Sequence, residues 1–216
     1  MSIDEQTQVV TEFPAGLGAG IMVIDGVVPL DLAEALYLFC VDGMDEIGRP
    51  GETVGGLLAN TKVTTDIRLS EMENWTGEWS VERLREVGYD MPSLDAQMVS
   101  IVTEVLRSYV ATYESLANMN FKDTGYQMQR YKKGEGFYKR HVDGDPCQCS
   151  ERILALVIYL NDVEEGGGTC FPWQGVTVQP RAGRVAVFPA NWMYPHEALV
   201  PASGDKFIIS TFIELQ

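Results

Sequence analysis

The spacing of apolar residues changes along the chain, from helical in the first half to strand-like in the second. Residues 18–28 form an apolar run that indicates a strand, and residues 29–42 follow with apolar side chains at helical spacing. Pro29 and Asp31 are typical of a helix start. The face that this helix should bury consists of Leu32, Ala35, Leu36 and Phe39.

The clearest helical pattern covers residues 93–116, and Ser93 is expected to be its N-cap. Before it, residues 42–56 predict a glycine-rich loop, residues 60–69 alternate like a strand, and residues 71–92 predict a short helix inside a loop. The apolar face of the clearest helix consists of Leu94, Met98, Ile101, Val102, Val105, Leu106 and Tyr109.

From Gly125 onward, short β-branched and aromatic runs are separated by Gly, Pro and Asn-Asp. The pattern predicts an α+β protein in which amino-terminal helices precede a strand-rich body. Many short strands with long crossing connections are typical of a jelly roll or a related barrel.

The charge of the chain limits its partners. Sixteen Lys and Arg residues against 31 Asp and Glu residues give a net charge of −15. Nucleic-acid and anionic-membrane binding need a basic face, so we expect neither partner. With four cysteines, no apolar run long enough to span a bilayer and no signal-peptide pattern, the expected location is cytoplasmic with reduced thiols.

The two histidines of the chain are the first candidates for chemistry. His141 and Asp143 are two residues apart, so on an extended strand both side chains reach the same face. His196 follows the apparent strand at residues 184–189. Two imidazoles and one carboxylate on one side of an ion leave positions open for substrate and oxygen, which is typical of non-haem Fe(II) oxygenases. Taken alone, an imidazole paired with a carboxylate would explain the same spacing.

The residues around this triad carry a family resemblance. The stretches RYKKGEGFYKRHVD, RILALVIYLNDVEEGGGTCFP and GRVAVFPANWMYPHEALVPASGDKFIISTFI resemble the catalytic core of the 2-oxoglutarate- and Fe(II)-dependent prolyl 4-hydroxylases over about residues 125–216. The residues that match the family pattern, in order, are Tyr131, Gly134, Tyr138, His141, Asp143, Tyr159, Gly166, Gly167, Thr169, His196 and Lys206.

The resemblance implies roles for several of these residues. His141, Asp143 and His196 would ligate Fe(II), and Lys206 would bind the far carboxylate of 2-oxoglutarate. The remaining implied cosubstrate contacts are Tyr131, Thr169 and Tyr159, for which ordinary strand packing is the competing interpretation; for Lys206 it is a surface position in a turn. Ascorbate dependence is a further family expectation.

The resemblance also implies a fold and an organisation. The fold would be a double-stranded β-helix, a jelly roll of cupin-like type, with the amino-terminal helices packed on it. Residues 1–20 would be a flexible segment and residues 21–124 a support region. Within the support region, the loops at 42–60 and 70–92 would border a groove for a peptide substrate. Residues 125–216 would be the dioxygenase core, within one continuous domain from about residue 21.

The expected activity is hydroxylation of prolyl residues in a peptide or protein, with molecular oxygen as the second substrate. A free amino acid or small metabolite remains open as the substrate, and so does a non-catalytic, cupin-like metal-binding domain. A zinc site built from His141, Asp143, Cys147 and Cys149 is another alternative, although it leaves His196 and Lys206 without a role.

A local basic island surrounds the His-x-Asp pair and has two interpretations. It would be either a solvated strand face or a positive rim that attracts an anionic cosubstrate or an acidic substrate. Its members are Arg130, Lys132, Lys133, Lys139 and Arg140.

Overall fold

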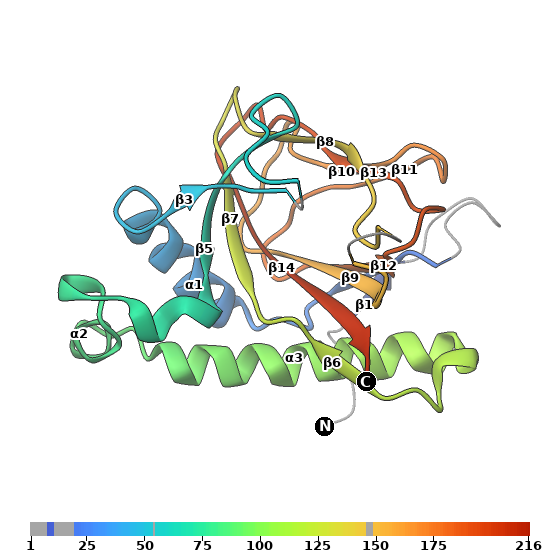
Figure 1. Ribbon diagram of the computed structural model, residues 1–216, viewed down its shortest axis with the longest axis horizontal. Helices are drawn as coiled ribbons and strands as arrows, with labels where there is room; N and C mark the ends of the chain where they lie inside the picture. The colour runs from blue at the N-terminus through green and yellow to red at the C-terminus, as the bar shows by residue number, and fades with distance from the viewer. Residues whose placement is uncertain (1–7, 11–19, 54, 146–148) are drawn as a thin grey trace.

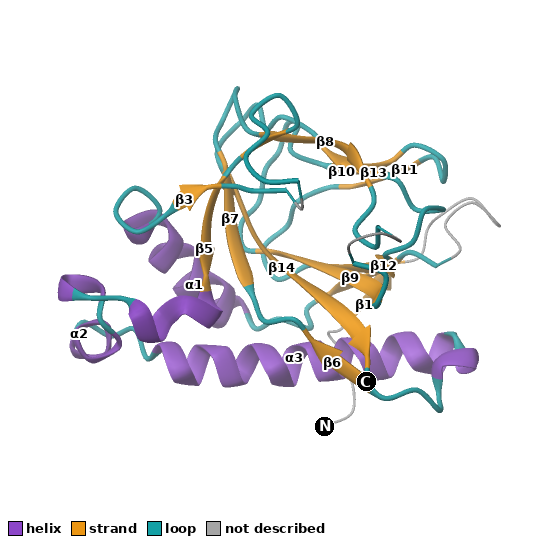
Figure 2. Ribbon diagram, viewed as in Figure 1, coloured by secondary structure: helices purple, strands orange, loops and turns teal. Residues whose placement is uncertain are grey.

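The computed structural model describes residues 8–10, 20–53, 55–145 and 149–216. Two antiparallel sheets face one another, and helices cover the outer side of the larger sheet (Figures 1 and 2). In the described residues the helices are α1 (Leu30–Gly43), α2 (Val81–Glu86) and α3 (Met91–Thr112), with the 3-10 turns η1 (Leu69–Asn74), η2 (Gly77–Trp79) and η3 (Glu114–Leu116).

The larger sheet carries the helices and the smaller sheet closes the sandwich. In spatial order the larger sheet contains β1 (Gln8–Val10), β2 (Met22–Asp25), β12 (Val185–Pro189), β9 (Arg152–Tyr159), β14 (Lys206–Leu215), β7 (Gln127–Tyr131), β5 (Thr65–Arg68) and β3 (Arg49–Pro50), and β6 (Phe121–Asp123) pairs with β14. The smaller sheet contains β11 (Val176–Val178), β10 (Thr169–Phe171), β13 (His196–Ala198), β8 (Phe137–His141) and β4 (Lys62–Val63). This arrangement is the predicted α+β jelly roll.

Alternation along the strands divides the core in two. On β9, Leu154, Leu156 and Ile158 pack toward the helices, whereas Val157 and Tyr159 pack between the sheets. The same period of two holds on β14, because successive side chains of a strand point to opposite faces. The helix layer therefore buries one face of the large sheet and leaves the other face for the interior of the sandwich.

The first helix is close to its prediction. It begins at Leu30, directly after Pro29, and the Asp31 side chain accepts a hydrogen bond from the Leu32 amide at 2.9 Å. Leu32, Leu36 and Phe39 are buried as expected, but Ala35 is only half-buried and Ala33 takes the place beside them.

Two sequence predictions about the first half were wrong. The long helix begins at Met91 with Asp90 as its N-cap, so Ser93 lies inside the first turn; Pro92 suits this turn because its missing amide proton is not needed there. Residues 60–69 are not one strand. The chain leaves β4 in the smaller sheet, crosses at Thr64 and enters β5 in the larger sheet.

Strands from both predicted parts of the chain share the same sheets. β5 lies between β7 and β3, and β4 pairs with β8. The predicted boundary between a support region ending at residue 124 and a core beginning at residue 125 thus stays a prediction. Both sheets contain strands from each side of this boundary. The predicted flexible segment 1–20 lies outside the described residues except for positions 8–10 and 20.

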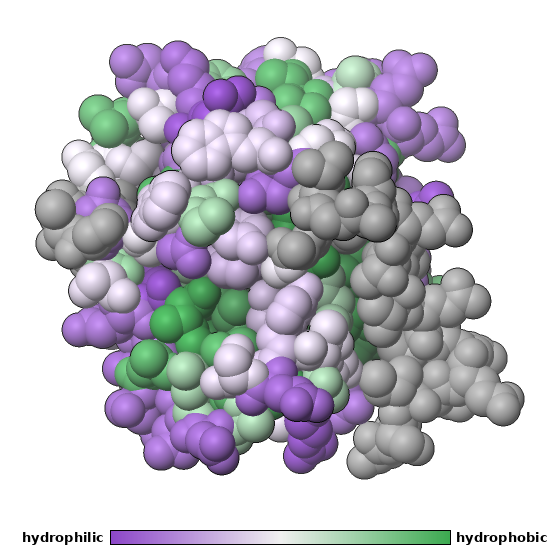
Figure 3. All heavy atoms as spheres, turned by 90° about the vertical axis from the view of Figure 1, so that its right-hand side faces the viewer, coloured by the Kyte–Doolittle hydropathy of each residue, from purple (hydrophilic) through white to green (hydrophobic). Residues whose placement is uncertain are grey.

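The surface of the described residues is mixed. Figure 3 shows one face on which hydrophobic side chains are exposed near the middle and hydrophilic ones gather around the edge. In the described part of the chain, no helix combines the length and the apolar character needed to cross a bilayer.

Leu36 offers a test of the packing between helix and sheet. Its side chain is completely buried on α1, so Leu36→Ala should lower the free energy of unfolding by about 3 kcal/mol. Leu38 on the same helix is 46% exposed, and Leu38→Ala should change it by less than about 0.5 kcal/mol. Urea unfolding compares the two variants, and equal losses would contradict this packing.

Candidate functional site

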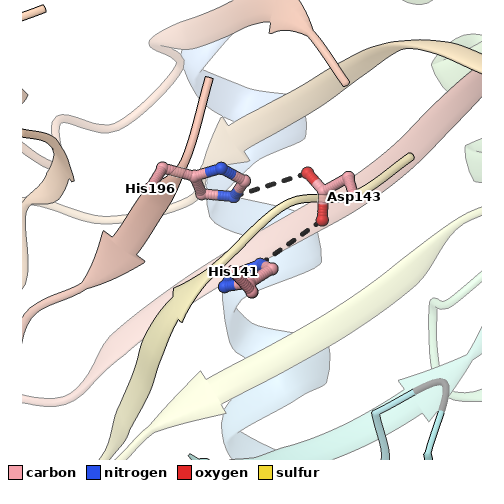
Figure 4. A group of neighbouring side chains, drawn as sticks. All are labelled: His141, Asp143 and His196. Atoms are coloured by element: carbon pink, nitrogen blue, oxygen red, sulfur yellow. Dashed lines mark ion pairs between the residues drawn. The ribbon is translucent and has the colours of Figure 1, made fainter. Parts of the chain in front are cut away.

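Three potential metal ligands meet where the two strands β8 and β13 pair. His141 ends β8, His196 begins β13, and the antiparallel register sets these two residues opposite one another. Asp143 follows His141 by two residues, so its carboxylate returns to the same side. Figure 4 shows both imidazole rings pointing toward this carboxylate, and candidate ligand atoms of the three residues lie within 4.8 Å of one another.

The hydrogen bonds around the two histidines determine which nitrogen faces the centre. Nδ1 of His141 lies 2.8 Å from the Lys139 carbonyl oxygen, and Nδ1 of His196 lies 3.2 Å from that of Tyr194. Nδ1 therefore donates in each ring and Nε2 keeps its lone pair. The two Nε2 atoms lie 3.3 and 3.4 Å from the two oxygens of Asp143.

The electrostatics of the group suit a cation. Burial raises the pKa of Asp143, but His196, His141 and Arg152 outweigh burial and bring it down to about 2. Burial lowers the pKa of His196 to about 4, even though Asp143 opposes the shift. At neutral pH the site thus offers a carboxylate and a neutral imidazole, which is the protonation state that metal binding requires.

Aromatic side chains fix the imidazole rings. Tyr138 stacks on His141 with ring centroids 3.5 Å apart and lines the cavity beside it. Phe188 lies edge-on to His196 at 4.7 Å, and Phe171 lies at 5.4 Å. These apolar contacts exclude water from one side of the site and hold the donor atoms in position.

Lys206 is a fully buried cation that lines the same cavity as the triad. Its Nζ donates to the Gly167 carbonyl at 2.9 Å and lies 3.9 Å from the ring centre of Tyr131. No acidic side chain among the described residues lies within ion-pair distance, and burial lowers the Lys206 pKa to about 7. The surface interpretation of Lys206 is wrong, and its position calls for an anion.

The other predicted contacts are also buried around this lysine. The Tyr159 hydroxyl donates to Thr169 Oγ1 at 2.7 Å, and the Tyr131 hydroxyl donates to Gln129 Oε1 at 3.3 Å. Tyr131 and Thr169 line the cavity with Lys206, whereas Tyr159 stands behind Thr169. The turn before Thr169 uses Gly167 with φ +68°, a conformation that other residues rarely adopt.

The cavity has a volume of about 380 Å³ and contains both the triad and Lys206 in its walls. The predicted loop 42–60 contributes Glu52 and Thr53 to it, but no residue of 70–92 lines it. Arg152 was not predicted and also lines it: its guanidinium lies 3.8 Å from the Phe212 ring centre and donates to the Asp143 carbonyl at 3.3 Å. In the sequence, Arg152 is marked only by its position directly before the apolar run 153–160.

The basic island does not form a free positive rim. None of its five members lines the cavity. Three of them have acidic partners: Arg130 lies 2.6 Å from Asp45, Lys132 lies 3.7 Å from Glu135, and Arg140 lies 3.6 Å from Glu197. The interpretation as a solvated face is favoured.

The zinc alternative finds no support in the described residues. Cys149 lines the cavity but is not part of the group of potential metal ligands, which contains His141, Asp143 and His196. Cys147 lies outside the described residues.

Comparisons with known proteins point to one family. Residues 126–214 match the family model described as the 2OG-Fe(II) oxygenase superfamily. A curated protein from Arabidopsis thaliana, "Probable prolyl 4-hydroxylase 9", is 27% identical over 117 residues; the match covers 42% of this chain and 41% of the relative, so it spans about two fifths of that protein's length.

Solved structures extend the likeness over the whole fold. A viral collagen prolyl hydroxylase from Paramecium Bursaria Chlorella virus-1, in its 2OG complex, has a TM-score of 0.61 and 19% identity and covers 93% of this chain and 98% of its own. A Pseudomonas putida prolyl-4-hydroxylase has a TM-score of 0.63 and 21% identity, and the match covers 90% of this chain and 92% of that protein. A prolyl hydroxylase from Trichoplax adhaerens, in complex with a peptide fragment of hypoxia inducible factor, has a TM-score of 0.66 and 16% identity. The match covers 90% of this chain and 83% of that protein. Because the sequence identities of these structures are low, their similarity to this chain establishes the fold alone.

Lys206 should make stability depend on pH with a definite sign. Its pKa is about 7 in the folded protein and ordinarily 10.5, so between these values the unfolded chain binds more protons. The free energy of unfolding should therefore rise as the pH increases from 7, whereas below pH 7 both states are protonated and the full penalty of the buried charge remains.

The variant Lys206→Met isolates this effect. Urea unfolding at several pH values above 7 should show a rise in the wild-type protein that is absent from the variant. Parallel curves for the two proteins would contradict a buried, unpaired ammonium at this position.

Proposed function

Because residues 126–214 match the family model of the 2OG-Fe(II) oxygenase superfamily, we propose that this protein is a dioxygenase that hydroxylates prolyl residues of a peptide or protein. The cosubstrate, 2-oxoglutarate, would be released as succinate and CO2. The observation that carries the proposal is the shared cavity, in whose walls the His141–Asp143–His196 group and the buried, unpaired Lys206 occur together.

The triad would hold Fe(II) through its two Nε2 atoms and one carboxylate oxygen. Two imidazoles and one carboxylate match the donor set of such iron sites and leave positions open for other ligands. The backbone carbonyls of Lys139 and Tyr194 keep the Nε2 lone pairs aimed at the ion. When bound, Fe(II) and 2-oxoglutarate supply the oxidative chemistry, while the protein orients and shields the reactants.

Lys206 would bind the far carboxylate of 2-oxoglutarate. An anion beside the ammonium removes the penalty of its burial, so the binding free energy includes that relief. Thr169 is prepared for the same ligand: its hydroxyl accepts from Tyr159 and so keeps its own proton to donate into the cavity. Tyr159 acts through Thr169, whereas Tyr131 lies directly against the ammonium.

Arg152 would position the substrate. Stacking on Phe212 and a hydrogen bond to the Asp143 carbonyl fix its guanidinium next to the metal ligands. Arg152 also lines the cavity, so its guanidinium can donate to a substrate held there. A backbone carbonyl beside the target proline suits a rigid, planar donor.

The choice of prolyl residues follows the similar proteins. The Arabidopsis relative and the three solved structures are all described as prolyl hydroxylases, and the Trichoplax protein is bound to a peptide. A free amino acid or small metabolite is the alternative substrate. A non-catalytic metal-binding domain would leave Lys206 buried without a purpose.

Two finer expectations stay predictions. One is the use of ascorbate, and the other is a cytoplasmic location. Among the described residues, Cys40, Cys149 and Cys170 are free thiols, which suits a reducing compartment.

A product assay tests the proposal. The protein is incubated with Fe(II), 2-oxoglutarate, isotopically heavy oxygen gas and a proline-rich peptide. Mass spectrometry should find one heavy oxygen atom on proline and one in succinate, in equal amounts. His141→Ala should abolish both products, because it removes a metal ligand, whereas Lys139→Ala on the same strand should not, because it keeps the backbone carbonyl that orients His141. Succinate formation that no proline peptide increases, or label found only on a free amino acid, would contradict prolyl hydroxylation.

A further inference from the structure

A second cavity of about 410 Å³ adjoins the first. The two cavities share Glu52, Arg68 and Gln127 in their walls. The rest of the second cavity is lined mainly by residues 46–50, around the start of β3, and by residues 71–76, around the end of η1. A polypeptide held in the first cavity can therefore continue into the second.

Asp66 in the wall of this second cavity has one oxygen without a donor. Its side chain is only 5% exposed. Oδ2 accepts from Lys62 Nζ at 2.8 Å and from Gln127 Nε2 at 2.5 Å, and Gln129 Nε2 lies at 3.5 Å. No described group donates to Oδ1, which is buried. A buried carboxylate oxygen without a donor is costly, so the position calls for a ligand that donates a hydrogen bond.

The charges around the cavity exclude an anion as that ligand. Arg49 and Arg68 share Glu71, at 3.6 and 3.7 Å. Arg68 also lies 4.0 Å from Glu52, so two carboxylates compensate the two positive charges. Glu46 is exposed and has no ion-pair partner among the described residues. The chain as a whole carries a net charge of −15, which attracts cations from solution.

We propose that the second cavity binds a lysine or arginine side chain of the polypeptide substrate, close in sequence to the residue that is hydroxylated. The proposal rests on the proposed function and names the substrate class of the same site. Lys62 already compensates the charge of Asp66, so Asp66 would contribute the hydrogen-bond acceptor Oδ1 and Glu46 would contribute the unpaired negative charge. Ile47 and Trp75 in the wall would contact the apolar stem of the side chain.

Peptide binding without turnover tests the proposal. The probes are fluorescently labelled peptides with one proline in a glycine–serine background and with lysine, glutamine or glutamate at one position beside it. The protein is loaded with Fe(II) and 2-oxoglutarate under nitrogen, and anisotropy gives the Kd. At one distance from the proline, the lysine peptide should bind about tenfold more tightly than the glutamine peptide, and the glutamate peptide more weakly. Added salt should reduce the difference.

Variants locate the preference in the second cavity. The ratio of the glutamine-peptide Kd to the lysine-peptide Kd should fall toward one in Asp66→Asn and should decrease in Glu46→Gln. The matched control Glu114→Gln, outside both cavities, should leave the ratio unchanged. If Asp66→Asn does not fold, Glu46→Gln decides, because the exposed Glu46 side chain is not needed for folding.

The outcomes separate this inference from the proposed function. Equal binding of the three peptides, or an unchanged ratio in both variants, would overturn the cation site. A lysine preference that depends on Asp66 and Glu46 would support the site even if no peptide is hydroxylated in air. The absence of hydroxylation in air would overturn the prolyl hydroxylase proposal and would leave the cation site intact.

Discussion

The antiparallel pairing of β13 with β8 is the constraint on which the site depends. It sets His196 opposite His141, although many residues separate them in sequence. A slip of one residue in either strand would turn that strand's histidine to the other face, because side chains alternate along a strand. The contacts of Tyr138 and Phe188 with the two rings oppose such a slip, so the core between the sheets and the metal site stabilise one another.

The second constraint is a charge that the fold buries without a partner. Lys206 begins β14, the strand between β9 and β7, and its backbone pairs with that of Tyr131. The pairing brings the Tyr131 ring against the ammonium, and the lysine side chain is fully buried in the wall of the cavity. The buried, unpaired ammonium lowers the stability of the free protein and raises its affinity for an anionic ligand.

Sequence patterns predicted the features that depend on local spacing. The strands of the second half, the first helix and the His-x-Asp pair follow from periods of two and of 3.6 residues. The crossing at Thr64 could not be predicted, because residues 60–69 alternate evenly although they join two sheets. Asp90 replaced Ser93 as the N-cap because both residue types suit that position and only the packing of the long helix decides between them.

Long-range contacts account for most of the remaining differences at the site. The burial of Lys206 depends on its pairing with β7, and the compensation of Arg130 and Arg140 depends on Asp45 and Glu197. Arg152 looks like an ordinary strand end in the sequence, and only its contacts with Phe212 and Asp143 indicate a role. Spacing along the chain therefore located the candidate metal ligands, whereas their surroundings required the fold.

An anaerobic titration tests the central claim, that one cavity combines a metal site with a separate anion site. Fe(II) and then 2-oxoglutarate are added to the wild-type protein and to the variants Lys206→Met and His141→Ala, while visible absorbance follows the iron-to-keto-acid charge-transfer band. The account predicts the band in the wild-type protein and none in His141→Ala. In Lys206→Met it predicts intact Fe(II) binding with the band shifted to much higher 2-oxoglutarate concentrations. A band that forms equally in Lys206→Met, or metal binding that depends on Cys149 and not on His196, would contradict it.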